Sequence, residues 1–251
     1  MTKRTKRWLF YSAVVVFLLL SYVVMLYAQG YKYSFSEGKF LRTGTISLKV
    51  NTEARVYLDD QLQGGTSFFT NAYSIDRLLP ERYKVTIQKD NYSSWQKTAV
   101  VEEGFVVDFP HAMLLPEEGE EEQKLFDAVD LLFKELEISP ISSLSKELLP
   151  AEIIKNMRGF QLSENENKFA WWTSSELWIL WLTDQNYQPF YKKGDKELIT
   201  RFQIPIQNGA WFKGEDHLVL ELEQRDSKNR PYSIYRIVEI DKRGGVNIVE
   251  L

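Results

Sequence analysis

The sequence that decides the fold is GTISLKVNTEARVYLDDQLQGGTSF, residues 44–68, with LLPERYKVTIQKDNYSSWQKTAVVEEG, residues 78–104. Polar and apolar residues alternate over 45–50, which is the period of a strand with one buried face. Short strands with turn signals about every 8 to 12 residues predict a small antiparallel β-sandwich over 31–116. The other strands are predicted at 55–58, 83–87, 95–101 and 105–115, with turns at 59–61, 64–66 and 89–92.

These two stretches resemble the PEGA domain family, whose members are β-sandwich modules of prokaryotic surface and envelope proteins. The resemblance covers about 70 residues, and it implies a structural or adhesive role without catalytic residues. Arg82 replaces the glycine that gives the family its name, and Asn91 replaces the glycine before the second tyrosine. Because Asn tolerates the left-handed conformation, the turn at Asn91 can survive. The matching positions are Val56, Tyr57, Asp59, Leu79, Pro80, Tyr83, Val85, Ile87, Lys89, Tyr92 and Trp95.

Two features of this region allow a structural or a functional interpretation. We interpret Tyr83, Tyr92 and Trp95 as core or cross-strand packing, and a sugar-stacking platform is the alternative. We interpret Asp59-Asp60 as a hairpin turn, because calcium binding needs several more oxygen ligands nearby.

An uncharged apolar segment precedes the sandwich. Leu9–Ala28, LFYSAVVVFLLLSYVVMLYA, is long enough as a helix to cross about 30 Å of hydrocarbon. The sequence therefore predicts a cytoplasmic tail at 1–7 and a transmembrane signal-anchor helix at 8–30. Lys3, Arg4, Lys6 and Arg7 place the N-terminus in the cytoplasm and the rest of the chain outside the cell membrane. The alternative is a cleaved signal peptide, since Ala28-Gln29-Gly30 resembles a cleavage site, although the apolar run is longer than in such peptides.

The acidic run at 117–123 is predicted to be a linker. Apolar residues at helical spacing predict a helix over about 120–136, and a second short helix is predicted at 150–157. Two similar strand pairs follow, 168–172 with 177–184 and 217–220 with 235–241, and 159–162 echoes 209–212. A hairpin repeat near 50 residues is typical of propeller blades. Residues 124–251 thus resemble about two blades of a WD-repeat-type β-propeller. Because a propeller closes with 4 to 8 blades, two are too few, and we favour a truncated reading frame as the explanation. The alternatives are an open pair of sheets and a ring that partners complete.

The fold class is therefore predicted as mainly β: one transmembrane helix, a small antiparallel sandwich, then blade-like antiparallel sheets with one or two short helices. Aromatic residues make up 14% of the chain, which suits strands. The net charge of -4 gives no strong field to attract nucleic acid. The absence of cysteine excludes disulfides and thiolate chemistry, and two distant histidines, His111 and His217, exclude a His-rich metal site.

No nucleophile elbow, phosphate loop or HExxH motif occurs, so the sequence predicts no catalytic, cofactor-binding or metal-binding residue. The expected function is a membrane-anchored, extracytoplasmic, non-enzymatic binding or scaffold protein of the bacterial envelope. Its expected partners are the lipid bilayer and an envelope protein or cell-wall glycan. The candidate glycan- or partner-binding residues are Trp171, Trp172, Trp178 and Trp181, for which core packing is the alternative.

Two other functions are weighed against this one. The first is an envelope glycan-active hydrolase or carbohydrate-binding protein. Its only catalytic suggestion is the acidic pair Glu215 and Asp216 near Trp211, and such a pair in a turn is expected to be solvated. The second is a signalling or secretion component, which a cytoplasmic part of about seven residues makes difficult.

Overall fold

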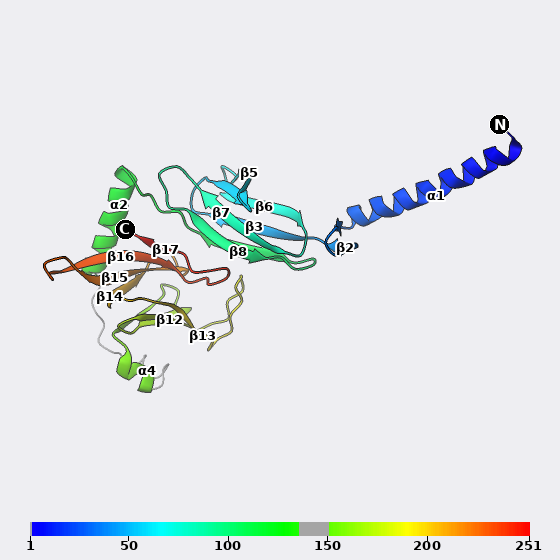
Figure 1. The fold of residues 1–251 in the computed structure, drawn as a ribbon. Helices are drawn as coiled ribbons and strands as arrows, with labels where there is room; N and C mark the ends of the chain where they lie inside the picture. Colours follow the sequence, from blue (N-terminus) through cyan, green and yellow to red (C-terminus); the bar gives the residue numbers. More distant parts are fainter. Residues whose placement is uncertain (1, 136–150) are drawn as a thin grey trace. The chain divides into compact units, whose positions relative to one another are not determined.

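The computed structural model describes residues 2–135 and 151–251 (Figure 1). Strands dominate, an apolar helix lies at the N-terminus and the strands form several antiparallel sheets, so the predicted fold class is confirmed. The described helices are α1 (Lys3–Ala28), α2 (Glu120–Glu135) and α4 (Ala151–Asn156). The strands of the first half are β1 (Tyr31–Ser34), β2 (Lys39–Arg42), β3 (Gly44–Val50), β4 (Arg55–Leu58), β5 (Gln61–Gly65), β6 (Ala72–Leu78), β7 (Arg82–Gln88), β8 (Trp95–Val100) and β9 (Val106–Ala112). Those of the second half are β10 (Gly159–Leu162), β11 (Lys168–Trp172), β12 (Glu176–Trp181), β13 (Lys196–Arg201), β14 (Ile206–Trp211), β15 (His217–Arg225), β16 (Pro231–Glu239) and β17 (Ile248–Glu250).

The chain forms two compact units. The first unit contains Met1–Ser47, Ser74–Tyr83 and Ala99–Asp108, and the second contains Leu48–Tyr73, Lys84–Thr98 and Phe109–Leu251. The candidate site described below is built wholly from residues of the second unit.

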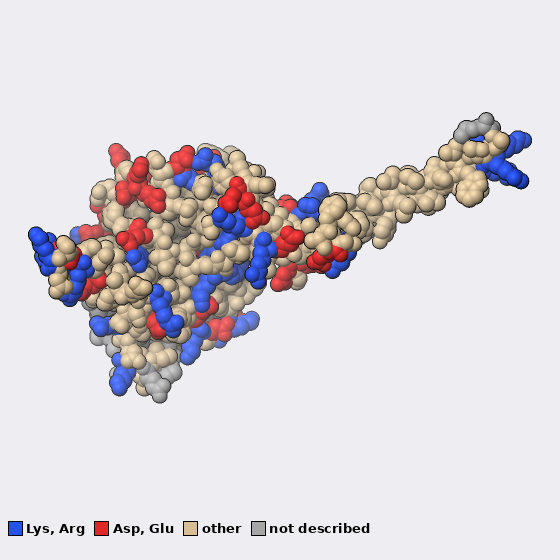
Figure 2. All heavy atoms as spheres, in the orientation of Figure 1, with Lys and Arg blue, Asp and Glu red and all other residues tan. Residues whose placement is uncertain are grey.

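Helix α1 is apolar on every side. It begins at Lys3, where Thr2 accepts a hydrogen bond from the Thr5 amide, so the four basic residues of the predicted tail lie within the helix itself. None of its 26 residues is buried, and its apolar window has a mean hydropathy of 2.5. Figure 2 shows basic side chains at its N-terminal end and an uncharged surface along its length. Among the described residues, α1 is the one helix long and apolar enough to cross a membrane.

The first half of the chain contains a three-stranded sheet, in the order β6-β3-β9, and a four-stranded sheet, in the order β5-β4-β7-β8. The turn predicted after β4 is confirmed, since Asp59 and Asp60 both have positive φ (48° and 64°), as a tight hairpin requires. Asn91 adopts the left-handed conformation expected of it, with φ 63°. The break predicted at 64–66 is wrong in part, because β5 continues through Gly65. Gly64 is needed there because a Cβ atom would lie 2.7 Å from the Tyr73 hydroxyl.

Strand β6 has no counterpart in the sequence prediction. Its buried residues are Ile75 and Leu78, three positions apart rather than two. Arg77 has φ 58°, and this left-handed residue breaks the alternation on which the prediction depends.

The second half contains two four-stranded antiparallel sheets with their strands in sequence order, β10-β11-β12-β13 and β14-β15-β16-β17. The two strand pairs predicted from the repeat are confirmed as β11-β12 and β15-β16. The predicted helices are confirmed as α2 and α4, although positions 136 and 150 of the two predictions lie outside the described residues.

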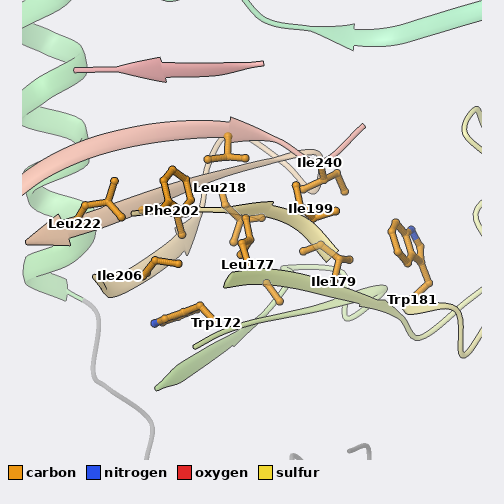
Figure 3. Packing of buried hydrophobic residues seen from close by; sticks show 13 residues of the cluster. Trp172, Leu177, Ile179, Trp181, Ile199, Phe202, Ile206, Leu218, Leu222 and Ile240 are labelled. Carbon is orange, nitrogen blue, oxygen red and sulfur yellow. The ribbon is translucent and has the colours of Figure 1, made fainter. Parts of the chain in front are cut away.

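The two sheets pack face to face around one core, which takes Trp172, Ile179 and Trp181 from the first sheet and Leu218 and Leu220 from the second (Figure 3). The outer face of the first sheet packs Phe169 and Trp171 beside Met157 and the half-buried Ile153 and Ile154 of α4. The outer face of the second sheet packs Phe212, Val219 and Ile237 against Leu125 and Val129 of α2. Strands β11 and β15 are consequently covered on both faces, which explains their continuous apolar runs.

The 50-residue echo has a structural basis in Trp172. A Cβ atom on Gly159 would lie 2.4 Å from Trp172 Cζ2, and a Cβ atom on Gly209 would lie 3.0 Å from Trp172 Cζ3. Both glycines of the repeat therefore make room for one buried indole ring between the two sheets.

Candidate functional site

The candidate site is organised around a buried lysine. Lys168 is the first residue of β11, and only 2% of its side chain is exposed. Its ammonium group donates to the Tyr187 hydroxyl (2.9 Å), the Glu215 carbonyl oxygen (2.9 Å) and Asp216 Oδ1 (2.8 Å). A buried ammonium is tolerated only with such partners, so the three oxygens fix this charge in place.

Asp216 is the anionic partner of this lysine. It also accepts hydrogen bonds from the Tyr187 hydroxyl (2.8 Å) and from His111 Nδ1. Burial by itself favours protonation of the carboxyl, but the His111 hydrogen bond and the charge of Lys168 outweigh it and hold the pKa of Asp216 well below its usual range. Asp216 is therefore ionised at neutral pH, with both oxygens engaged.

Tyr187 stays protonated beside that carboxylate. Burial, and then the charge of Asp216, raise the pKa of the Tyr187 phenol far above its ordinary value. The phenol therefore acts as a hydrogen-bond donor at physiological pH rather than as a base.

Corresponding turns of the two sheets bring these groups together. Lys213 (φ 47°) and Gly214 (φ 117°) shape the turn between β14 and β15 that carries Glu215. Glu215 accepts hydrogen bonds from the Asn165 amide and from Asn167 Nδ2, both at 3.3 Å, in the turn between β10 and β11. The repeat thus places two equivalent turns side by side, and each contributes one charge of the Lys168–Asp216 pair.

A cavity of about 440 Å³ opens beside this network. Lys49 and Lys213 line it and are exposed, and neither forms an ion pair within the described part of the chain. The polar or charged residues that line it are Lys49, Asn51, His111, Asn165, Tyr187, Lys213, Glu215, Asp216 and His217. Its volume falls within the usual range of small-molecule pockets, about 300 to 1,000 Å³.

A second buried lysine lies at Lys97, whose side chain is fully buried. It donates to the carbonyl oxygens of Asp241 and Gly245 and lies 3.2 Å from Glu239 Oε2. Trp95 Nε1 donates to the same carboxylate at 3.0 Å. Burial raises the pKa of Glu239 although Lys97 opposes the change. Every group here faces another protein group, so this pair connects β8 to β16 and its following turn.

His217 is buried and lies next to Asp216 in sequence. Burial lowers the pKa of its imidazole from 6.5 to about 4, so it is neutral at physiological pH. Although His111 and His217 lie 106 residues apart in sequence, both line the 440 Å³ cavity.

The four candidate tryptophans do not share one surface. Trp172 and Trp181 belong to the core between the sheets, and Trp171 lies on the outer face of the first sheet. Because these three are at most 2% exposed, their interpretation as core residues is confirmed. Trp178 is half-buried, and its ring stacks on Trp171 with centroids 5.7 Å apart. Trp178, stacked on the buried Trp171, lines with it a separate cavity of about 250 Å³ together with Glu176 and Lys196, so Trp178 remains the glycan candidate.

The expectation that Glu215 and Asp216 form a solvated acidic pair is wrong for Asp216. Only 16% of its side chain is exposed, and it is paired with a lysine 48 residues earlier. The available signal was Lys168 itself, a charged residue directly before the apolar residues 169–172.

For Trp95 the packing interpretation is confirmed, because its ring is 1% exposed.

Among residues 2–135 and 151–251, no group of three or more His, Asp or Glu residues is placed to hold a metal ion. Neither a protein-family model nor a curated protein matches the chain. A function for this chain is therefore inferred from α1, from the two cavities and from the groups that line them.

Proposed function

We propose that the chain is a membrane-anchored, non-enzymatic binding or scaffold protein of the bacterial envelope, with the residues after α1 on the extracytoplasmic side. The observation that carries this proposal is the surface of α1. Its apolar side chains are exposed all around the helix, from Leu9 (52%) to Tyr27 (48%). A helix that is apolar on all sides and covered by no protein is suited to lipid.

The charge distribution supports the proposed orientation. Four basic residues lie in the first turns of α1, and the following 24 residues, 8–31, carry no charge. Cytoplasmic flanks of single-pass helices are rich in Lys and Arg, which places the N-terminus inside the cell.

Aromatic side chains at the other end of α1 support the same proposal. Tyr27 packs edge-on against Phe40 with centroids 6.3 Å apart, and Tyr33 contacts both Phe35 and Phe40. Phe35, in the turn between β1 and β2, is 92% exposed. Amphipathic and aromatic rings at the end of a spanning helix suit the membrane–water interface.

A binding role fits the second unit better than catalysis does. Asp216 is held ionised and Tyr187 is held protonated, and each is engaged with Lys168. A glycosidase needs instead a carboxylic acid with a raised pKa beside a second, free carboxylate. The network orders the wall of a cavity, and neither Asp216 nor Tyr187 is free to transfer a proton to a substrate.

The topology can be tested with single cysteines, because the natural chain has none. Thr2→Cys marks the start of α1, and Ser227→Cys marks the exposed turn between β15 and β16. In intact spheroplasts a membrane-impermeant maleimide should label Ser227→Cys, and it should label Thr2→Cys only after permeabilisation. The reverse pattern, or equal labelling of both, would contradict the proposal. Absence of the Thr2→Cys site from the mature polypeptide would indicate a cleaved signal peptide.

A carbohydrate-binding function is the second candidate, and the Trp171–Trp178 cavity favours it. The cavity combines indole rings with Glu176, which accepts a hydrogen bond from Trp178 Nε1 (3.0 Å), and with the exposed Lys196. Such a mixture of apolar ring and polar rim suits one sugar ring. Sedimentation with insoluble cell-wall glycan should weaken for Trp178→Ala and stay unchanged for Phe190→Ala, an exposed aromatic elsewhere. Equal sedimentation of both variants and the natural chain would exclude this cavity.

A further inference from the structure

The charged groups of the 440 Å³ cavity differ in whether they are already paired. Lys49 and Lys213 line it together with the carboxylates of Glu215 and Asp216, and the buried Lys168 pairs with Asp216 from behind the lining. Its walls come from β3, β9 and the equivalent turns of the two sheets, so the charges converge from elements far apart in sequence.

The carboxylates of this cavity are already occupied. Asp216 accepts from Lys168, Tyr187 and His111, and Glu215 accepts from the turn at Asn165–Asn167. Each of the four carboxylate oxygens therefore already accepts at least one hydrogen bond from the protein. Asn51 is likewise engaged, because its side-chain amide exchanges two hydrogen bonds of 2.9 Å with the Leu114 backbone.

The donors of the cavity are in the opposite situation. Lys49 and Lys213 are exposed and form no ion pair with a described residue; Lys213 instead lies over the Phe212 ring at 5.2 Å. The His111 side chain is 48% exposed and is oriented through Nδ1 by Asp216, so its Nε2 is available and donates to an anion when the ring is protonated. A histidine whose second nitrogen is fixed by a carboxylate is held in one orientation.

We infer that this cavity binds an oxyanion, a phosphate or carboxylate group, between Lys49, Lys213 and His111. Occupied acceptors, unpaired ammonium groups and an oriented imidazole form the complement of such a group. The inference deepens the proposed binding function by naming the chemistry of the ligand at this site.

The two histidines provide the readout. In the full chain in detergent, with each histidine labelled with ¹³C at Cε1 alone, only two ring signals are expected. The His111 signal is assigned by its loss in His111→Gln. Inorganic phosphate should shift that signal, and it should shift the signal of the buried His217 ring much less. Glycerol at the same concentration is the neutral control and should shift neither signal. An unmoved His111 signal up to millimolar phosphate would overturn the inference.

Charge variants locate the site. Lys49→Gln with Lys213→Gln should weaken phosphate binding about tenfold or more, since two charged donors are lost. Lys124→Gln with Lys228→Gln removes two exposed lysines elsewhere and keeps the same net charge, so it should bind as the natural chain does. Equal loss in both double variants, or in neither, would overturn the assignment to this cavity.

The source of the oxyanion is settled by a third comparison. Nanodiscs that contain phosphatidylglycerol should shift His111 beyond those of phosphatidylcholine if a lipid headgroup enters the cavity. A shift with inorganic phosphate alone identifies a soluble ligand, and both results support oxyanion binding. Because the phosphate titration uses detergent-solubilised chain, its failure leaves the membrane topology untouched, and failure of the topology test leaves this result untouched.

Discussion

Helices α1 and α2 show how differently two helices of one chain are stabilised. Helix α2 buries Leu125 and Val129 against the second sheet and stacks Phe133 on Tyr235. The charged side chains of Lys124, Asp127 and Asp130 stay exposed. Helix α1 has no buried residue and no polar face over its apolar length. The partner of α2 is protein and the proposed partner of α1 is lipid, so the same kind of substitution should have different consequences in the two helices.

The largest effect is expected from charge in the middle of α1. Val16→Lys with Leu20→Lys should cost about 5 to 7 kcal/mol of insertion free energy, at about 2.5 to 3.5 kcal/mol for each lysine. This cost approaches the whole insertion free energy that the apolar side chains of α1 contribute. The variant should therefore be lost from the carbonate-resistant membrane fraction. Leu131→Lys, on the exposed side of α2 (54% exposed), is the control and should stay membrane-bound. Full retention of the double variant would contradict a lipid-facing α1.

A charge in α2 should act on folding instead. Val129 is completely buried, so Val129→Asp places a carboxylate without a partner between α2 and the second sheet. We expect a loss of about 3 to 5 kcal/mol in the free energy of unfolding, measured by urea titration with tryptophan fluorescence in detergent. Membrane retention of this variant should be unchanged. An unaltered urea midpoint would mean that α2 does not pack as described.

Lowering the pH should change the stability of the second unit and leave the membrane retention of α1 unchanged. The folded pKa of His217, about 4, lies below its ordinary 6.5, so its contribution is present above pH 6.5 and is lost as pH falls from 6.5 to about 4. The loss should be about 2 to 3 kcal/mol. Glu239 acts in the opposite sense, because its pKa is raised and its protonation on acidification adds stability. Over the same window α1 should remain in the membrane, since it contains no acidic residue and no histidine.

The matched comparison for this prediction is His217→Gln, which cannot titrate. Its unfolding free energy, measured across pH 7 to 4 beside the natural chain, should lack the loss assigned to His217 while keeping the contribution of Glu239. Parallel pH curves for the two proteins would show that His217 is not the buried titrating group.

The smallest effect is expected at the edge of the α2 contact. The Phe133 and Tyr235 rings stack with centroids 5.2 Å apart, but both are only half-buried. Phe133→Ala should lower the free energy of unfolding by about 1 to 2 kcal/mol, through the lost stacking and part of the buried area. Leu131→Ala on the exposed side should change it by less than about 0.5 kcal/mol. Equal effects at the two positions would contradict the described face of α2.

The predictable part of the fold is the part that a local pattern determines. Alternation gave β3, helical spacing gave α2, and a left-handed turn was expected at Asn91 and found there. Strand β6 was missed because the left-handed Arg77 shifts its buried residues out of period. Tertiary packing, rather than local propensity, also decides that β5 continues through Gly64 and Gly65.

The candidate site was much less predictable, because its groups come from distant segments. Lys168 contacts Tyr187 and Asp216, which lie 19 and 48 residues later, and His111 reaches Asp216 across 105 residues. The apolar residues 169–172 mark Lys168 as unusual, but nothing local identifies its partners. The same limit applies to the four candidate tryptophans. The sequence identified them as a cluster, but it could not predict which of them lie on the inner face of the sheet and which on the outer face.

The repeat was predictable as a pattern, but its surroundings were not. Two equivalent sheets were expected and found, and resemblance to a propeller stays a prediction. In a propeller each sheet packs against a neighbouring sheet on both faces, whereas here α2 and α4 cover the outer faces. A third sheet on either face would have to displace a helix.

The position of α1 in a membrane, with the sheets outside the cytoplasm, is the claim on which the proposed function rests. Its most direct test is trypsin added to intact spheroplasts that express the chain with a C-terminal epitope tag. Exposed basic residues such as Lys193 and Lys228 should be cleaved without permeabilisation, which removes the tag from a fragment that stays in the membrane with α1. A tag that survives until the membrane is permeabilised, or that is found in the soluble cytosolic fraction, would contradict the account.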